Sequence, residues 1–406
     1  MAVIRAFRAL RPARENAAAV SSVPYDVVNT DEARQLASNN PLSFLHVTRS
    51  EIDLPAGNDP YVPRVYERAK ENFAALRAQA PLVAEDEPSV YFYRLRMGAH
   101  DQTGIAACFS VDEYEQDVNK KHERTRPDKE DDRTRHIVAL RAQTGVVFLT
   151  YRASESIDRL CRAVTADAPI YDFRADDGVH HTIWRVRARE ATELVDAFSR
   201  IPALYIADGH HRAASAARAR AEMRSRGVAD HDADTFIAVA FPDDQMQILP
   251  YNRTVTDLAG QTPAAFLSAL RQAVPVKEAH ATPRGKGEVA MFLDGKWYSL
   301  DLSNAVPEDG SRAGALDVAL LQHHVLGPLL QIGDVRTDKR IDFVGGARGT
   351  AALEKAVTSG QAAVAFSLHP VTIDDLMAIS DEGGIMPPKS TWFEPKLRDG
   401  LLIHTI

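Results

Sequence analysis

The sequence predicts an α/β (α+β) protein with a mixed β-sheet at its core. Strand-forming runs alternate with helical runs along the chain, which is typical of this fold class. Two consecutive strand runs, at 89–95 and 103–111, surround a turn and predict an antiparallel hairpin. A further apolar run at 202–208 leads through a tight turn into a helical run at 213–226, so strands that continue into helices are expected as well.

The first half of the chain contains local sequence signals for several helices and strands. Asn29 precedes a helical run and predicts a capped helix start at Thr30. Residues 61–80 predict a second helix, because apolar side chains recur there at helical spacing. These side chains are Val65, Ala69, Phe73 and Leu76. A buried strand is expected at 146–151, and another strand is expected to end at 184–186.

The second half of the chain continues the alternation of strands and helices. The predicted elements are two strands within 235–249, a helix at 263–273, a hairpin at 288–302, and a strand, glycine-rich turn, helix and strand within 341–368. The sequence pattern changes after Asn252. We therefore predict two regions, 1–254 and 255–406, with the second packed against the first.

The composition excludes several classes of protein. The 406 residues are 45% hydrophobic and carry a net charge of −8, which argues against disorder, nucleic-acid binding and binding to acidic membranes. No run of about 18 apolar residues occurs, so no membrane span is expected. Cys108 and Cys161 are the only cysteines, which favours a reducing cytoplasm and excludes a Cys-based zinc site. The sequence leaves open whether the protein forms a homo-oligomer.

The segment from Asp208 to Arg212 is the strongest candidate for a catalytic site. Asp208 ends a predicted strand, and Gly209 allows a tight turn that a ligand can approach closely. Free N–H groups of the next helical turn bind anions, helped by the helix dipole. His210, His211 and Arg212 add donors suited to phosphate oxygens. Asp208 beside such a phosphate site suits a phosphoryl transfer with Mg²⁺, as catalytic residue and metal ligand.

A purely structural interpretation of this segment stays open. Asp208 would then only cap the following helix, and the two histidines would be polar surface residues. Adjacent histidines on a helix point about 100° apart. A zinc ion shared by His210 and His211 is therefore not expected.

A second candidate is the densely charged segment 115–136. Fourteen of its 22 residues are charged, seven of each sign, which is typical of a solvated helix with ion pairs between turns. Pro127 prevents one regular helix, and the segment connects two predicted strands, where function is often located. We therefore favour a polyphosphate site over a solvated face. Its phosphate-binding candidates are Lys121, His122, Arg124, Arg126 and Arg133.

Two further regions hold weaker candidates for substrate binding. The proline-rich segment 386–396 contains Lys389 and Ser390 and would cover a ligand. Near the N-terminus, Tyr25, Asp26 and His46 stand between apolar residues of turns and strands. Local packing is the more common role of such residues.

Five motifs in matching order resemble a prokaryotic protein family of unknown function, domain-of-unknown-function family 1015. They are VPYDVV at 23–28, NPLSFLH at 40–46, the charged run 120–136, YIADGHHR at 205–212 and MPPKST at 386–391. The resemblance covers nearly the whole chain. It implies membership of the family but no activity.

The segment 208–212 also resembles, more distantly, the signature of free-serine kinases built on the ParB/sulfiredoxin fold. In that superfamily a Gly-x-x-Arg turn, here Gly209 to Arg212, opens a helix and binds nucleotide phosphates. The resemblance implies a ParB/sulfiredoxin-like strand-turn-helix unit and a catalytic role for Asp208. The base in those kinases is the Glu of an upstream His-Glu pair, which implies this role for Glu123. Those kinases are shorter and lack the charged run around Glu123.

Four functional hypotheses follow. The preferred one is a cytoplasmic kinase that uses ATP or ADP with Mg²⁺ to phosphorylate a small hydroxylated metabolite such as free serine. The second is a phosphatase or phosphotransferase that acts on phosphoserine. A ParB-like nucleotide-binding regulator is the third, and the acidic composition argues against its coupling to DNA. A zinc-dependent hydrolase is the fourth, supported only by scattered histidines.

Overall fold

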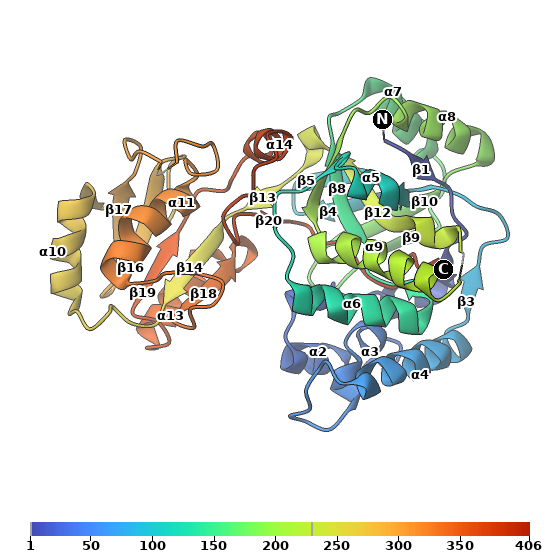
Figure 1. Cartoon of the computed structure of the whole chain (residues 1–406), viewed down its shortest axis with the longest axis horizontal. Coiled ribbons are helices and arrows are strands. Elements are labelled where there is room, and N and C mark those ends of the chain that lie inside the picture. Colours follow the sequence, from blue (N-terminus) through green and yellow to red (C-terminus); the bar gives the residue numbers. More distant parts are fainter. Residues whose placement is uncertain (1, 229, 308) are drawn as a thin grey trace. The chain divides into compact units, whose positions relative to one another are not determined.

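The computed structural model describes residues 2–228, 230–307 and 309–406. It has a mixed α/β fold, as the sequence predicted (Figure 1). The described residues fall into two compact units. The first consists of Met1–Met246 with Pro395–Ile406, and the second of Gln247–Glu394. The division at residue 254 inferred from the sequence stays a prediction.

Among the described residues, nine strands form one sheet in the first unit. They are β1 (Ile4–Arg5), β4 (Tyr91–Met97), β5 (His100–Ser110), β6 (Asn119–Lys120), β8 (Val147–Tyr151), β9 (Tyr171–Arg174), β10 (His180–Arg185), β11 (Leu204–Asp208) and β12 (Thr235–Pro242). The order is β6-β11-β8-β12-β5-β4-β10-β9, with β1 beside β5. The sheet is mixed, because β6–β11 and β8–β12 are parallel and the other pairs are antiparallel.

Helices and two short strand pairs complete the first unit. The pairs are β2 (Leu10–Pro12) with β3 (Leu82–Ala84), and β7 (Ala142–Gln143) with β21 (His404–Thr405). The helices are α1 (Ala17–Val20), α2 (Thr30–Ala37), α3 (Leu45–Thr48), α4 (Pro63–Gln79), α5 (Val111–Glu115), α6 (Pro127–Leu140), α7 (Glu155–Val164), α8 (Ala188–Phe198) and α9 (His210–Ser225). Single 3₁₀ turns lie at Arg14–Asn16, Tyr25–Val27, Ser50–Asp53, Asp232–Asp234 and Asp243–Gln245.

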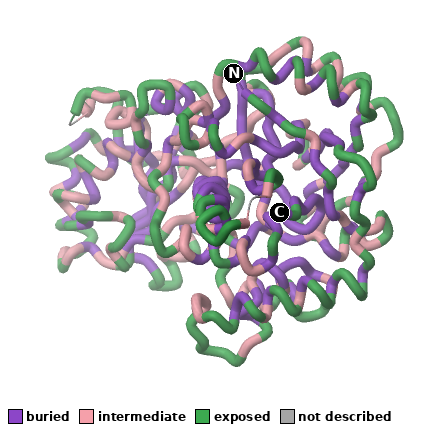
Figure 2. The backbone as a smooth tube through the Cα atoms, turned by 45° about the vertical axis from the view of Figure 1, so that its right-hand side comes forward, coloured by how far each residue is buried: buried purple, intermediate pink, exposed green. Residues whose placement is uncertain are grey.

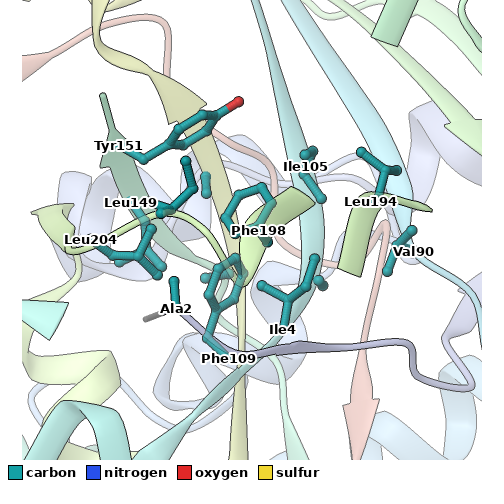
Figure 3. Close-up of a cluster of buried hydrophobic side chains, with 14 of the residues drawn as sticks. Ala2, Ile4, Val90, Ile105, Phe109, Leu149, Tyr151, Leu194, Phe198 and Leu204 are labelled. Carbon is teal, nitrogen blue, oxygen red and sulfur yellow. The ribbon is translucent and has the colours of Figure 1, made fainter. Parts of the chain in front are cut away.

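The main core of the first unit lies where helices cover the central strands. Alternate side chains of a strand point to the same face of the sheet, so Leu149 and Tyr151 of β8 lie in one cluster. Phe198 of α8 packs there against Phe109 of β5, with ring centroids 6.2 Å apart (Figure 3). Figure 2 shows long buried stretches in the inner part of the chain, and exposed residues along outer helices as well as along connecting segments.

Several sequence predictions for the first unit are confirmed. The predicted helix at 61–80 is α4, and its predicted apolar face is buried. The predicted hairpin is formed by β4 and β5. Asn29 caps α2: its side chain accepts the Glu32 N–H at 2.9 Å, and the Glu32 carboxylate accepts the Asn29 N–H at 2.9 Å.

The second unit contains a six-stranded antiparallel sheet in its described part. Its strands are β14 (Tyr251–Val255), β15 (Val276–Glu278), β16 (Glu288–Leu293), β17 (Lys296–Asp301), β18 (Ile341–Gly345) and β19 (Val364–Ser367), in the order β15-β17-β16-β19-β14-β18. A small pair joins β13 (Ile248–Leu249) to β20 (Trp392–Phe393). The helices are α10 (Pro263–Ala273), α11 (Asp317–Leu321), α12 (Gly327–Leu330), α13 (Gly349–Thr358) and α14 (Ile373–Asp381), with a π-helical turn at Gln322–Leu326 and a 3₁₀ turn at Gly346–Arg348.

The predicted elements of the second unit are present too. The helix expected at 263–273 is α10, the hairpin within 288–302 is β16–β17, and the series within 341–368 is β18, α13 and β19. No helix in the described ranges is long and apolar enough to cross a membrane.

Candidate functional site

The predicted strand, turn and helix around Asp208 are present as β11, Gly209 and α9; we call residues 208–212 the Asp208 turn. The pairing of β11 with β8 shifts register between Ile206 and Asp208, an irregularity that redirects the end of a strand. Gly209 has φ +94°, in the left-handed region that glycine adopts without strain. A Cβ there would lie 3.0 Å from Cζ of Arg212. Glycine is therefore required by both the backbone and its neighbour.

Arg212 lies behind the turn and is 6% exposed. Its Nη2 is 3.1 Å from Oδ2 of Asp208 and 3.3 Å from Oδ2 of Asp26. Its Nη1 donates to the carbonyl of Val146. Burial by itself lowers the pKa of Arg212, but the charges of Asp26 and Asp208 raise it above its ordinary value. Nε of Arg212 is buried with no hydrogen-bond partner among the described atoms.

Lys396 brings a second positive charge to Asp208. Its Nζ lies 3.4 Å from Oδ2 of Asp208. Burial favours the neutral acid, but Lys396 and Arg212 hold the pKa of the Asp208 carboxyl well below its usual range. Asp208 is therefore ionised at neutral pH, and 31% of its side chain is exposed. Such a carboxylate suits the positioning of charge better than proton abstraction, which needs a pKa near the working pH.

His122 and Glu123 lie beside His210. The His122 N–H donates to Nε2 of His210 at 3.4 Å, and the two rings meet edge to face with centroids 4.5 Å apart. Oε2 of Glu123 is 4.0 Å from Nδ1 of His210. Burial lowers the pKa of both histidines, that of His122 to about 4, so both rings are neutral at pH 7. Because Nε2 of His210 accepts a hydrogen bond, its proton lies on Nδ1 and faces Glu123.

His211 joins the same loop at a second point. Its Nε2 accepts the backbone N–H of Arg126 at 3.0 Å. The two adjacent histidines therefore hold the loop 122–126 against the start of α9, and the structure brings the charged run to the Asp208 turn. Both Nε2 atoms accept backbone donors, so the phosphate-binding role of His210 and His211 stays a prediction for their Nδ1 atoms.

The rest of the charged run forms α6, which begins at Pro127 as expected for a residue that cannot continue a preceding helix. This helix packs beside α9 (Figure 1). Arg218 of α9 pairs with Glu130 at 3.1 Å and with Asp131. Two acidic residues of α6 therefore connect it to α9, and the loop before α6 reaches the site.

Tyr25, Asp26 and Arg133 reach the buried side of Arg212. The guanidinium of Arg133 lies 4.2 Å from the ring centroid of Tyr25. A cavity of about 20 Å³ lined by Tyr25, Arg133 and Arg212 has room for about one water molecule. A nucleotide does not fit this cavity, so we expect ligands on the exposed side of the Asp208 turn.

The other predicted site residues are not all brought together. Lys121 donates to a backbone carbonyl at 2.8 Å, and His46 lies 2.9 Å from a carboxylate of the Ser50–Asp53 turn. Lys389 and Ser390 belong to the second unit. Arg124 and Arg126 lie on the loop 122–126, with exposed side chains.

Sequence reasoning missed Lys396 and Asp399, which the final segment of the chain places in the first unit. Asp399 is 1% exposed, and its backbone pairs with that of Ser22 at 3.0 and 3.1 Å. The segment 386–396 ends at Lys396, and it is the only sequence motif that could have indicated a role for this lysine. No local pattern marks Asp399, because its environment is made by segments distant in the sequence.

The residues around Asp208 fit Mg²⁺ only as an ion that accompanies phosphate. In the described part of the chain, no group of three His, Cys, Asp or Glu residues could hold a metal ion. Mg²⁺ is commonly bound by one or two carboxylates together with substrate phosphates. Asp208 could supply one such carboxylate, and the assignment stays a prediction.

Residues 4–319 match the family described as "Protein of unknown function (DUF1015)". The chain belongs to this family, as its motifs predicted. No curated protein sequence matches the chain.

The similar solved structures include SbnI from Staphylococcus aureus with a C-terminal truncation, at 14% identity and TM-score 0.39, with 72% of this chain and 85% of that chain covered. A free serine kinase in complex with AMP has 12% identity and TM-score 0.35, with 73% and 91% covered. A conserved hypothetical protein from Pyrococcus furiosus has 13% identity and TM-score 0.36, with 73% and 94% covered. Likenesses this remote carry no argument about function, which must come from the site.

Proposed function

We propose that this protein is a nucleotide-dependent kinase that phosphorylates the hydroxyl group of a small metabolite. One observation carries the proposal: an ionised, partly exposed carboxylate, a lysine, a helix N-terminus and a Glu–His pair meet at the Asp208 turn. Phosphoryl transfer relies on positioning and charge stabilisation, which these groups supply. Free serine is the favoured acceptor, because the turn resembles the signature of free-serine kinases.

Phosphate oxygens would bind at the start of α9. The first-turn N–H groups of a helix lack intrahelical acceptors and attract anions together with the helix dipole. Lys396 and the buried Arg212 add positive charge at 3.4 and 3.1 Å from Oδ2 of Asp208. These cations also keep Asp208 ionised, so that it can orient a cation on the phosphates. Mg²⁺, when bound there, would neutralise phosphate charge.

Glu123 is the proposed base. Its carboxylate, 42% exposed, faces the Nδ1 proton of neutral His210 at 4.0 Å. It would take the proton of the acceptor hydroxyl while that oxygen bonds to phosphorus and the bond to the leaving nucleotide breaks. His210 would then act as a positioning residue that directs the carboxylate.

The test begins with the wild-type protein and Asp208→Asn. We expect ATP or ADP to raise the melting temperature of the wild type with Mg²⁺ present, and serine with the nucleotide to yield phosphoserine. Asp208→Asn should lower the rate about 100-fold or more, because it removes the charge but keeps the size.

Asp230→Asn is the matched control. Asp230 lies 3.2 Å from Arg141 and is 29% exposed, much like Asp208 beside Arg212, but it is not part of the proposed machinery. It should keep wild-type activity. Full activity of Asp208→Asn would contradict the catalytic assignment. Nucleotide binding without transfer in either direction would favour a regulator, and the absence of nucleotide binding would refute the kinase.

A further inference from the structure

The second unit contains a buried positive charge without a carboxylate partner among the described residues. Arg253 of β14 is 3% exposed. Its Nη1 donates to the carbonyl of Tyr251, and its Nη2 donates to the carbonyls of Lys389 at 2.9 Å and Pro388 at 3.4 Å. Burial lowers its pKa to about 10, which leaves it protonated at neutral pH. Buried charges are costly unless paired, so a counter-charge is expected nearby.

Arg253 holds the MPPKST loop (residues 386–391) in a defined conformation. Within this loop, Oγ of Ser390 donates to the carbonyl of Pro387 at 2.6 Å. Lys389 has φ +59°, in the left-handed region that few residues other than glycine adopt. Its side chain is exposed. The loop therefore presents a lysine on a backbone that Arg253 fixes through two carbonyls.

Aromatic side chains support the end of the same loop. Trp392 packs on Gly345, where a Cβ would lie 2.6 Å from the indole. Tyr251 meets Trp392 edge to face with ring centroids 5.1 Å apart, and Nζ of Lys389 lies 5.7 Å from the Tyr251 ring. A rigid support of this kind lowers the ordering cost of binding.

We infer that the MPPKST loop is a phosphate-binding site of the second unit, with Lys389 as the direct ligand and Arg253 as a positioning residue. Lys389 on the loop and the buried Arg253 of β14, which donates to two carbonyls of the loop, place two positive charges together. Two such charges favour a doubly charged phosphate over a single carboxylate. The phosphate group belongs either to a nucleotide or to a phosphorylated metabolite. This inference concerns binding alone and does not depend on the proposed phosphoryl transfer.

The test is a calorimetric titration of the full chain with pyrophosphate. Lys389→Gln should weaken pyrophosphate binding about tenfold or more, because a charge-assisted contact is lost. Lys355→Gln on α13 is the matched control: it removes an exposed lysine of the same unit and should bind like the wild type. Titrations with ADP and phosphoserine distinguish the two sources, since the true ligand should bind more tightly than pyrophosphate and lose affinity in Lys389→Gln.

Two outcomes separate this inference from the proposed function. Unchanged pyrophosphate binding in Lys389→Gln, with a loss in Lys396→Gln, would overturn the inference and leave the kinase proposal standing. Pyrophosphate binding that depends on Lys389, in a protein without phosphoryl transfer, would support the inference while the kinase proposal fails.

Discussion

Two carboxylates near Arg212 differ in their charge state. Lys396 and Arg212 hold the pKa of Asp208 below its usual range. Burial raises the pKa of Asp399 to about 7, an effect that Asp26 increases and Arg212 opposes. Oδ2 of Asp399 has no hydrogen-bond partner among the described atoms. The charge of Arg212 therefore acts both on a carboxylate that is ionised at neutral pH and on a carboxyl group that titrates near neutral pH.

The raised pKa of Asp399 predicts a pH-dependent stability. Its unfolded-state value is about 4, so between about pH 4 and 7 the folded state holds a proton that the unfolded chain releases. The proton on Asp399 makes its full contribution to the free energy of unfolding below pH 4. This contribution decreases as the pH rises, by about 4 kcal/mol in total up to pH 7. Asp399→Asn imitates the neutral acid and should lack this decrease. Urea unfolding of both proteins at pH 5 and pH 8 measures the difference.

The variant should gain stability relative to the wild type at the higher pH. Arg133, Arg212 and Asp26 face the same group and are unchanged in the variant. An equal difference in unfolding free energy at both pH values would show that Asp399 is ionised in the folded protein throughout this range.

At the scale of single elements, local patterns were sufficient. The apolar spacing of 61–80, the Asn29 cap and the turn between β4 and β5 each depend on residues within one or two turns of chain, and each is confirmed. The charged run was harder, because balanced charges suit both a surface helix and a site. The structure divides it at Pro127 into a loop held by the histidines of α9 and a helix that packs beside α9.

The start of α9 also depends on Gly209. Gly227, which follows the end of α9, is a second glycine with positive φ, so the effects of alanine at the two positions can be compared. Alanine at φ +94° (Gly209) or φ +75° (Gly227) should cost about 1–2 kcal/mol for the left-handed backbone. Gly227 has no atom within 4 Å of an added Cβ, whereas at Gly209 the Cβ would lie 3.0 Å from Arg212. Gly209→Ala should therefore lower the free energy of unfolding by about 1 kcal/mol more than Gly227→Ala does. Denaturant unfolding of both variants measures this difference.

Equal losses in the two variants would mean that Arg212 moves aside without cost. In that case the contact between Gly209 and the guanidinium would not explain why the turn carries a glycine.

At the scale of the whole molecule, the residues that sequence reasoning missed come from long-range contacts. Lys396 and Asp208 are 188 positions apart, and nothing in either segment specifies the other. The chain leaves the first unit after Met246 and returns at Pro395. Only the tertiary structure shows this return, so the Asp208 turn could be predicted as a site but its lysine could not.

This return predicts that the final segment stabilises the first unit alone. Leu401, Leu402 and Ile403 are at most 2% exposed, and Leu10 and Ile403 exchange backbone hydrogen bonds at 3.0 Å. Burial of such side chains contributes about 1.5–3 kcal/mol each, and a domain is stable by only about 5–15 kcal/mol. A chain that ends at Glu394 should therefore lose protection from hydrogen exchange in the first sheet but keep it in the second.

Ile403→Ala is the graded control for this truncation. It leaves Lys396 and Asp399 in place and should lower the unfolding free energy of the first unit by about 2–5 kcal/mol. Amides of β16 and β19 should exchange as in the wild type in both variants, because their sheet contains no residue of the final segment. Loss of protection in both sheets after truncation would show that the two units fold as one cooperative body. Protection retained in both would show that the final segment adds no stability to the first unit.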